Sequence, residues 1–175
     1  MKAFFAGVVV TLLVLFVGGY YFLTLGYLNV AADQPTSRFE RRLAMSAMDA
    51  STERHAPDLK NPVQATEENL VAGAKLYLEH CAGCHGLPSN PESRFSRSFN
   101  PPTPGFFKNA PDMPDNQNFY IIQHGVRWTG MPAWSKTLTE EQMWQIATFM
   151  ANVEKLPPAA RKVLEPEPTA APSPR

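Results

Sequence analysis

The chain has 175 residues and a mass of 19.4 kDa, which allows one ordinary domain with accessory segments and excludes a large multidomain enzyme. Sixteen Lys and Arg balance sixteen Asp and Glu, so the formal net charge is zero and no basic surface for nucleic acid is indicated. Only two Cys occur, which excludes a framework of several disulfides. We therefore expect a small protein without a nucleic-acid partner.

An apolar segment opens the chain. No charged side chain occurs between residues 3 and 32, where most residues are Val, Leu, Phe, Ala, Gly or Tyr. A membrane-spanning helix needs about 20 apolar residues, whereas the core of a signal peptide has about 7 to 15. The length therefore predicts that residues 1–32 are a retained transmembrane anchor. The alternative is a signal peptide, because the small residues Val30, Ala31 and Ala32 would allow cleavage before Asp33 and release of a soluble protein.

The charges on the two sides of this segment do not settle its orientation. Lys2 lies before it, whereas Arg38, Arg41 and Arg42 follow it. The positive-inside rule alone would place the bulk of the chain in the cytoplasm. The chemistry of the central part of the chain, described below, indicates the opposite side.

Residues 33–65 are predicted to form a stalk or linker. Ser37 and Glu40 have the spacing of a capping box, and the apolar residues Phe39, Leu43 and Ala47 recur at helical spacing. One short amphipathic helix is therefore expected, which must end before Pro57.

The C-terminal segment, residues 157–175, is rich in Pro, Ala and Glu and has almost no large apolar side chains. Such a segment buries too little apolar surface to offset the entropy lost on ordering. We expect a disordered, Pro-rich tail.

Residues 66–156 are predicted to form one compact domain. Thr66, followed by two Glu, is a candidate N-cap of a first helix that runs to Glu79. Thr139, with a Gln three residues later, completes a capping box at the start of a last helix, which the Pro pair after residue 156 would end. No run of alternating β-branched residues lies between these helices. The fold class is therefore predicted to be all-α, with long loops.

The motif Cys81-Ala-Gly-Cys84-His85 follows directly on the first helix. Two thiols at this spacing can form thioether bonds with the vinyl groups of a haem, and the adjacent His can then bind the iron from one side. The motif therefore predicts one covalently attached haem c, with His85 as the proximal ligand.

Three other readings of this motif are less consistent with its context. A thioredoxin-type CxxC requires a βαβ setting, which is absent. A structural zinc site would lack a second CxxC or HxxxH pair, and the adjacent Cys84 and His85 are awkward tetrahedral partners. A disulfide between Cys81 and Cys84 would close a very small loop and stabilise little.

A six-coordinate haem needs a second axial ligand from a distant loop, and five residues are candidates: Met131, Met113, His124, His80 and His55. Met131 is favoured, since it stands in the Gly- and Pro-containing loop Gly130-Met131-Pro132-Ala133-Trp134 that leads toward the last helix. Met113 lies in a polar turn, and the three His are read as loop or surface residues. A Met at position 131 that only fills a gap in the core is the structural alternative.

Residues 66–156 resemble a class I cytochrome c. The resemblance rests on Gly73-Ala-Lys-Leu-Tyr77 leading into the CxxCH motif, on Gly130-Met131-Pro132-Ala133-Trp134, and on the helix Met143-Trp-Gln-Ile-Ala-Thr-Phe149-Met150. It implies a class I cytochrome c fold, in which helices and long loops wrap around one covalent haem.

The resemblance also implies specific contacts. The first and last helices should cross with Gly73 and Tyr77 against Ile146, Phe149 or Met150, which would explain a mid-helix Gly that costs about 1 kcal/mol relative to Ala. A Pro carbonyl should accept the ring N–H of the ligand His. Pro101 or Pro102 is the candidate, although Asn100-Pro-Pro-Thr-Pro104 departs from the usual pattern.

Two neighbouring residues and four aromatic residues are further candidates around the haem. Arg127 and Trp128 precede Met131 and can bind a haem propionate, with an ordinary solvated charge as the alternative for Arg127. Aromatic side chains can keep water from the iron or belong simply to the core: Trp134, Phe106, Phe107 and Tyr120.

His and Met on the two sides of the iron would leave no open position for a substrate, so we expect an electron carrier and not an enzyme. The expected partners are a redox protein donor and acceptor, chiefly membrane complexes of a respiratory or photosynthetic chain, with no small-molecule substrate. Family members receive haem on the outer side of the bacterial cytoplasmic membrane. This implies a single-pass membrane protein with a periplasmic haem domain, or a soluble periplasmic protein if residues 1–32 are removed.

Two other functions remain open at this point. The chain can be a fixed haem-binding subunit of a larger respiratory complex, with the transmembrane helix and the C-terminal tail as assembly contacts. A gas sensor or enzyme would instead require a labile or missing distal ligand.

Overall fold

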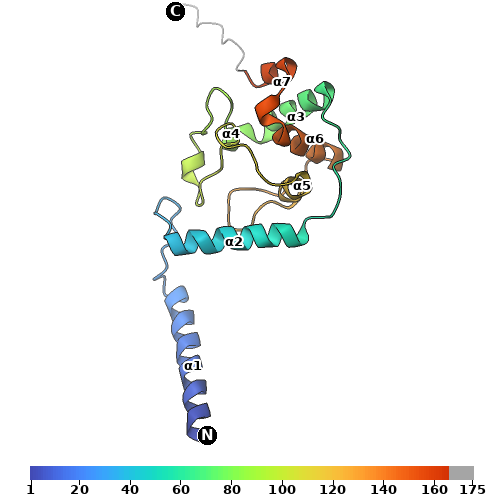
Figure 1. Cartoon of the computed structure of the whole chain (residues 1–175). Helices are drawn as coiled ribbons and strands as arrows, with labels where there is room; N and C mark the ends of the chain where they lie inside the picture. Colours follow the sequence, from blue (N-terminus) through green and yellow to red (C-terminus); the bar gives the residue numbers. More distant parts are fainter. Residues whose placement is uncertain (166–175) are drawn as a thin grey trace, which may run out of the picture. The chain divides into compact units, whose positions relative to one another are not determined.

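A computed structural model describes residues 1–165, and every regular element in this part of the chain is helical (Figure 1). The α-helices are α1 (Lys2–Thr24), α2 (Arg38–His55), α3 (Glu67–His80), α4 (Ala82–His85), α5 (Asp115–His124), α6 (Glu140–Ala151) and α7 (Pro158–Val163). Short 3₁₀ turns occupy Ser96–Ser98 and Val153–Lys155. The described residues contain no β-strand, and the only bridge of that type joins Leu87 and Asn90. The all-α prediction is confirmed.

The chain divides into two compact units, Met1–Gln34 and the part from Pro35 onward. The first unit consists mainly of α1, whose 23 residues have a mean hydropathy of 2.3 over the most apolar window and no buried side chain. The helix is long and apolar enough to cross a membrane, and its place at the N-terminus also suits a signal sequence.

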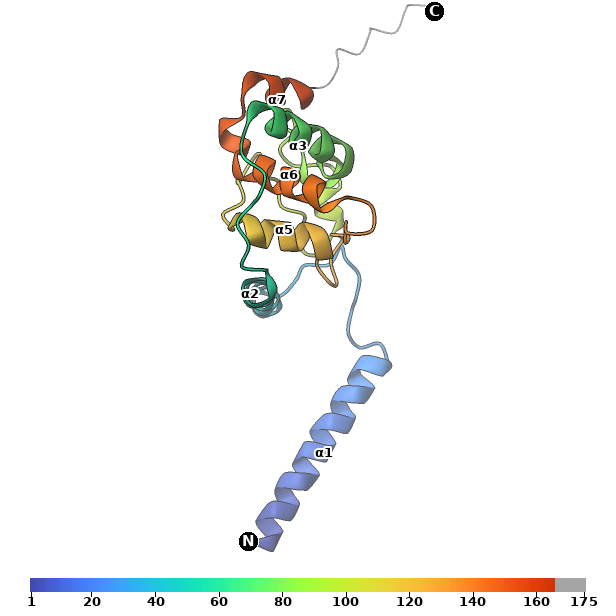
Figure 2. The same cartoon turned by 90° about the vertical axis from the view of Figure 1, so that its right-hand side faces the viewer.

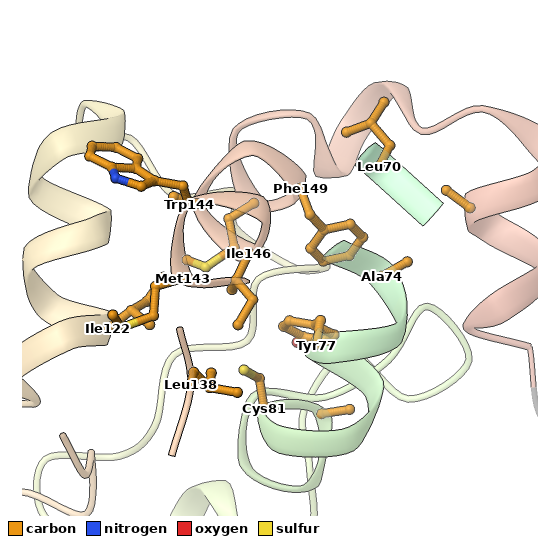
Figure 3. Close-up of a cluster of buried hydrophobic side chains, with 14 of the residues drawn as sticks. Leu70, Ala74, Tyr77, Cys81, Ile122, Leu138, Met143, Trp144, Ile146 and Phe149 are labelled. Atoms are coloured by element: carbon orange, nitrogen blue, oxygen red, sulfur yellow. The ribbon is translucent and has the colours of Figure 1, made fainter. Parts of the chain in front are cut away.

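The core of the second unit is the crossing of α3 and α6. A Cβ atom on Gly73 would lie 2.4 Å from the carbonyl oxygen of Gln145 and 2.7 Å from the Cβ of Phe149. The buried ring of Tyr77 packs against Phe149 with a centroid distance of 5.1 Å (Figure 3). The expected crossing of the first and last helices of the predicted domain is confirmed, and it explains why residue 73 has no side chain.

Helix α5 packs against α6 on the other side of this core. The rings of Phe119 and Trp144 are stacked, with centroids 3.9 Å apart, and Ile122 adds a further buried contact. The three helices α3, α5 and α6 therefore bury one continuous apolar cluster. Figures 1 and 2 show the arrangement of these helices from two sides.

The two capping predictions for these helices are confirmed. The Thr66 side chain accepts a hydrogen bond from the backbone N–H of Asn69 at the start of α3. Thr139 and Gln142 form the complete reciprocal capping box of α6. These caps satisfy backbone donors that would otherwise be unpaired in the first turn of each helix.

Helix α2 is longer than the short helix expected in the stalk, and it packs on the domain that begins at residue 66. Ser37 caps it by accepting a hydrogen bond from the N–H of Glu40, Thr52 is buried, and the helix contacts α5 (Figure 2). Just before the helix, the Thr36 hydroxyl donates to Asn100 Oδ1 at 2.5 Å. The sequence did not reveal this packing because the apolar pattern of the helix marks the opposite face, where Phe39 and Leu43 are exposed.

Polar contacts continue along the segment after α2. Asn61 donates from Nδ2 to Asp115 Oδ2 at 2.9 Å and to Thr148 Oγ1 at 2.8 Å, and its Oδ1 accepts from the N–H of Val63. The Asn116 amide donates to the Pro57 carbonyl oxygen at 2.9 Å. Residues 57–63 are thus held on α5 and α6, and are part of the folded unit.

The C-terminal prediction needs correction up to residue 165. α6 ends at Ala151, before the Pro pair, and Pro158 begins α7, since Pro is well tolerated in the first turn of a helix. Ala160 and Leu164 are 0% and 1% exposed, and α7 packs against α3. Residues 157–165 are therefore folded, and the rest of the predicted tail lies outside the described residues.

We expect Gly73→Ala to destabilise the folded protein by about 1–2 kcal/mol. The added methyl group would overlap the Gln145 carbonyl, and overpacking costs about 1–3 kcal/mol, of which the better helix propensity of Ala offsets up to about 1 kcal/mol. Equilibrium urea unfolding measures the change. Lys75→Ala, at an exposed position of the same helix, should change the free energy of unfolding by less than about 0.5 kcal/mol. Equal stability of the two variants would contradict the close crossing.

Candidate functional site

The α4 turn places the three residues of the CxxCH motif together. Backbone N–H groups of Cys84 and His85 donate to the carbonyl oxygen of Cys81 at 3.1 and 2.9 Å, which forms a single helical turn. Gly86 ends this turn at φ +85°, and a Cβ there would lie 2.6 Å from the Pro91 carbonyl oxygen. A glycine is therefore required where the chain leaves the motif.

Both cysteines of the motif are free thiols in the structure. Cys81 is buried in the core cluster, near Leu138 and below Tyr77 in Figure 3, whereas Cys84 is half-buried. Burial, followed by the neighbouring Cys84, raises the pKa of the Cys81 thiol to about 12. A thiol that stays protonated at neutral pH is a poor redox nucleophile, which argues against a thioredoxin-type role.

His85 is held in one orientation by two contacts. Its Nδ1–H donates to the Pro104 carbonyl oxygen at 2.9 Å, and its ring stacks on Phe106 with centroids 4.4 Å apart and an interplanar angle of 9°. The proton on Nδ1 leaves the Nε2 lone pair free, and no described residue forms a hydrogen bond with Nε2. Burial lowers the pKa of His85 from its usual value, which favours the neutral, metal-binding form.

The Pro that accepts the His85 proton is Pro104, so the prediction of Pro101 or Pro102 is wrong. Ser96 holds Thr103 by two hydrogen bonds, from Thr103 N to Ser96 O at 3.1 Å and from Ser96 Oγ to Thr103 O at 2.8 Å. The following carbonyl is thereby turned toward His85. Pro101 and Pro102 are exposed.

Gly105, directly after Pro104, is the sequence feature that could have identified Pro104 as the acceptor of the His85 proton. A Cβ on Gly105 would lie 2.2 Å from the Pro91 carbonyl oxygen, so the Pro104-Gly105 pair can be placed only where two loops approach closely. Sequence alone does not show which loop approaches, and the sequence analysis therefore considered only Pro101 and Pro102.

An ion-pair cluster closes the loop between Gly86 and Lys108. The Glu92 carboxylate accepts hydrogen bonds from Lys108 Nζ and, at 3.3 Å, from Arg97. These bonds, that of Lys108 first, lower the pKa of Glu92 below its usual value. The cluster joins the part of the loop next to the CxxCH turn to the part next to Phe106.

Met131 lies in a tightly bonded loop between α5 and α6. Its N–H donates to Thr129 Oγ1 at 3.1 Å and its carbonyl oxygen accepts from the Val126 N–H at 3.1 Å. Gly125 has φ +66°, and a Cβ there would lie 2.6 Å from the Met131 carbonyl oxygen. The backbone of Met131 is therefore well defined, and its side chain is half-buried.

Two contacts connect the Met131 loop to the His85 side of the site. A Cβ on Gly130 would lie 2.4 Å from the Phe99 ring, and Phe99 begins the loop that ends at Pro104. Trp134 packs on His80, next to Cys81, with ring centroids 5.1 Å apart. Sequence analysis missed the role of Phe99 and Gly130, since only the tertiary fold brings these residues into contact.

The other predicted ligand candidates occupy different surroundings. His124 is exposed at the end of α5 beside Tyr120, and His55 is exposed at the end of α2, where its Nδ1 lies 2.8 Å from the Ser51 carbonyl oxygen. Met113 is half-buried, and its carbonyl accepts from the Asn118 side chain.

Arg127 and Trp128 are exposed at the tip of the Met131 loop. The Arg127 guanidinium lies 6.0 Å from the Trp128 ring centroid, and Trp128 is 90% exposed at φ 60°. Their suggested contact with a haem propionate remains a prediction.

The residues of this site fit a haem c. Two free thiols and a histidine with a free Nε2 stand on one turn, and partly buried apolar side chains surround them, including Leu87, Phe106, Phe107 and Trp134. Within residues 1–165 no group of three or more His, Cys, Asp and Glu side chains is arranged to hold a metal ion, which argues against the structural zinc reading.

Residues 68–150, just under half of the chain, match the family model described as "Cytochrome C oxidase, cbb3-type, subunit III". No curated protein matches the chain. The matched segment runs from the first turn of α3 to the last turn of α6 and includes the CxxCH turn, the Pro104 loop and the Met131 loop.

We expect the Glu92 cluster to stabilise the protein above about pH 4.5, the ordinary pKa of a glutamate, and less as the pH falls below it. A carboxylate with a lowered pKa in the folded state loses its contribution as the pH falls through that lowered value. The thermal midpoint of the wild type should therefore decrease more steeply in acid than that of Glu92→Gln. Glu53→Gln, at an exposed position on α2, should keep the wild-type slope. Equal slopes for all three proteins would show that the cluster contributes nothing.

Proposed function

We infer the function from the class of the folded domain: the family match over residues 68–150 and the all-helical fold support a class I c-type cytochrome domain. Domains of this class bind haem covalently and are typical of electron carriers. We propose that this protein transfers single electrons through one haem c, with Cys81 and Cys84 as attachment residues and His85 and Met131 as axial ligands.

The observation that carries this proposal is the state of the His85 ring. The Pro104 carbonyl accepts the Nδ1 proton and Phe106 lies against the ring face, so Nε2 is the nitrogen that can bind a metal. The hydrogen bond also increases the basicity of the imidazole as a ligand. When bound, haem supplies one-electron exchange between the ferric and ferrous states.

The remaining residues position the second ligand and exclude water. Gly125, Thr129 and Val126 hold the Met131 backbone, while Gly130 allows Phe99 to pack against the same loop. A thioether ligand favours the ferrous state and thus a higher potential than two histidines would give. With both positions of the iron occupied, the site would exchange electrons without binding a substrate.

The proposed location is the outer side of the bacterial cytoplasmic membrane, with α1 as a retained single-pass anchor. The 23-residue length of α1 supports a membrane span, and covalent attachment of haem to CxxCH motifs outside the cytoplasm supports the orientation. The donor and acceptor would be redox proteins of a respiratory or photosynthetic chain, chiefly membrane complexes.

A fixed haem-binding subunit of a larger respiratory complex is the second candidate. Two observations favour it over a freely moving carrier. The matched family model is named for an oxidase subunit, and residues 35–65 pack on the domain and cannot serve as a long flexible stalk. A gas sensor or an enzyme would instead require a free coordination position.

The ligand proposal is tested with three methionine variants. Met131→Ala should retain covalent haem but bind carbon monoxide in the ferrous state at neutral pH, because a coordination position opens. Met131→His should lower the reduction potential by on the order of 0.1 V or more, within the ~0.8 V range that axial ligands span. Met113→Ala should behave as the wild type in both measurements. Carbon monoxide binding by the wild-type protein would instead support the sensor or enzyme.

The proposals of one haem per chain and of a retained anchor are tested by native mass spectrometry. The protein is expressed with a haem-attachment system and extracted in detergent. We expect the mass of the full-length chain plus one haem, because the span is long enough to be retained and there is one CxxCH motif. A mass that begins at Asp33 would make the protein a soluble periplasmic carrier. Stoichiometric additional subunits would favour the fixed-subunit function, and absence of haem, when a control cytochrome matures, would refute the haem proposal.

A further inference from the structure

Helix α2 is held rigidly on the cytochrome domain by one of its faces. Thr52 is buried and Met48 half-buried on the face that packs against α5. The chain is held before the helix by the hydrogen bond from Thr36 to Asn100 and after it by that from Asn116 to Pro57. The opposite face of α2 therefore has a fixed orientation relative to the haem site.

That opposite face carries two large exposed apolar side chains. Phe39 and Leu43 are 77% and 60% exposed, and they lie one helical turn apart. At roughly 100° per residue, both project about opposite to Thr52 and Met48, and Ala47 and Ala50 continue the same face. We call this surface, made of Phe39, Leu43, Ala47 and Ala50, the outer face of α2.

The charge around this face is positive at its N-terminal end. Arg38, Arg41 and Arg42 stand against the single Glu40 in the first turns of α2, although the whole chain has zero net charge. By the same helical geometry Arg42 borders the outer face. Arg binds phosphate oxygens through a planar fork of donors, and its apolar stem can lie along an apolar surface.

The chain length limits how far this face can lie from the end of the apolar helix. α1 ends at Thr24, and Thr36 is already bonded to the domain, so the connecting segment can reach at most about 45 Å when fully extended. A surface held this close to a bilayer encounters lipid at a high effective concentration, and even a small apolar and basic patch can then remain bound.

We propose that the outer face of α2 lies on the surface of the membrane that α1 crosses, with Phe39 and Leu43 at the level of the headgroups and acyl chains and Arg42, at the border of the face, on the phosphates of anionic phospholipids. The inference rests on the retained anchor of the proposed function. It means that the haem domain has a preferred orientation on the bilayer and does not swing on a flexible stalk.

The test uses the full-length, haem-loaded protein in vesicles of phosphatidylcholine with or without phosphatidylglycerol. The photoreactive residue p-benzoylphenylalanine replaces Phe39 in one variant and Phe95, an exposed aromatic residue of the loop after α4, in the control. After illumination, mass spectrometry identifies what each position has bound. We expect lipid adducts at position 39, more abundant than at position 95 by on the order of tenfold, and a higher yield with the anionic lipid.

The role of the arginine is tested in the same vesicles. Arg42→Gln should lower the adduct yield at position 39 several-fold with phosphatidylglycerol present, and little in phosphatidylcholine alone. Lys75→Gln, at an exposed position on α3, is the control and should leave the yield unchanged.

Each other outcome overturns a defined part of the inference. Adducts to a second copy of the chain, adducts to another protein in native membranes, or equal lipid yields at positions 39 and 95 would each refute lipid docking while leaving the anchor intact. A chain that lacks residues 1–32 would refute the anchor, and with it the docking. Haem attachment and the reduction potential, measured on the same samples, report separately on the proposed electron-transfer site.

Discussion

The close crossing of α3 and α6 at Gly73 determines how the rest of the domain is arranged. The C-terminal end of α3 leads directly into Cys81, and the N-terminal end of α6 follows the loop that carries Met131. Because the Gln145 carbonyl and Phe149 occupy the space of a residue-73 side chain, the two helices are locked at one separation. The crossing thereby brings together two parts of the haem site that are about fifty residues apart in the sequence.

The loops of the site have little regular structure and depend on specific contacts instead. Ser96 orients the Pro104 loop, Glu92 closes the loop after α4, and Phe99 packs on Gly130. A domain of this size buries a modest fraction of its surface. Its apolar side chains around the CxxCH turn are only partly buried, as expected for a surface that packs against a large apolar cofactor.

The packing of residues 35–65 changes how the protein is expected to work. A flexible stalk of that length would let the domain exchange electrons with distant partners, since reach grows with linker length. The hydrogen bonds of Thr36 and Asn61, and the packing of α2 on α5, leave only the short connection after α1 as a tether. Such a short tether suits electron transfer between neighbours in one membrane better than transport over long distances.

The sequence by itself determined the features that depend on neighbouring residues. The Cys81, Cys84 and His85 motif, the caps at Thr66 and Thr139, the apolar helix and the all-helical class all follow from local chemistry and spacing. Gly73 is unfavourable within a helix, and this indicated that another element passes close to it. The resemblance to a cytochrome implied that this element is the last helix, and the structure shows that the contacting atoms belong to Gln145 and Phe149.

Only the tertiary structure decided which loop residues meet. It selected Pro104 over Pro101 and Pro102, brought Phe99 against Gly130, packed α2 on α5, and folded residues 157–165 onto α3. These contacts join residues distant in the sequence through hydrogen bonds and close packing. No periodic pattern encodes such contacts, because each depends on the position of a partner that the local sequence does not contain.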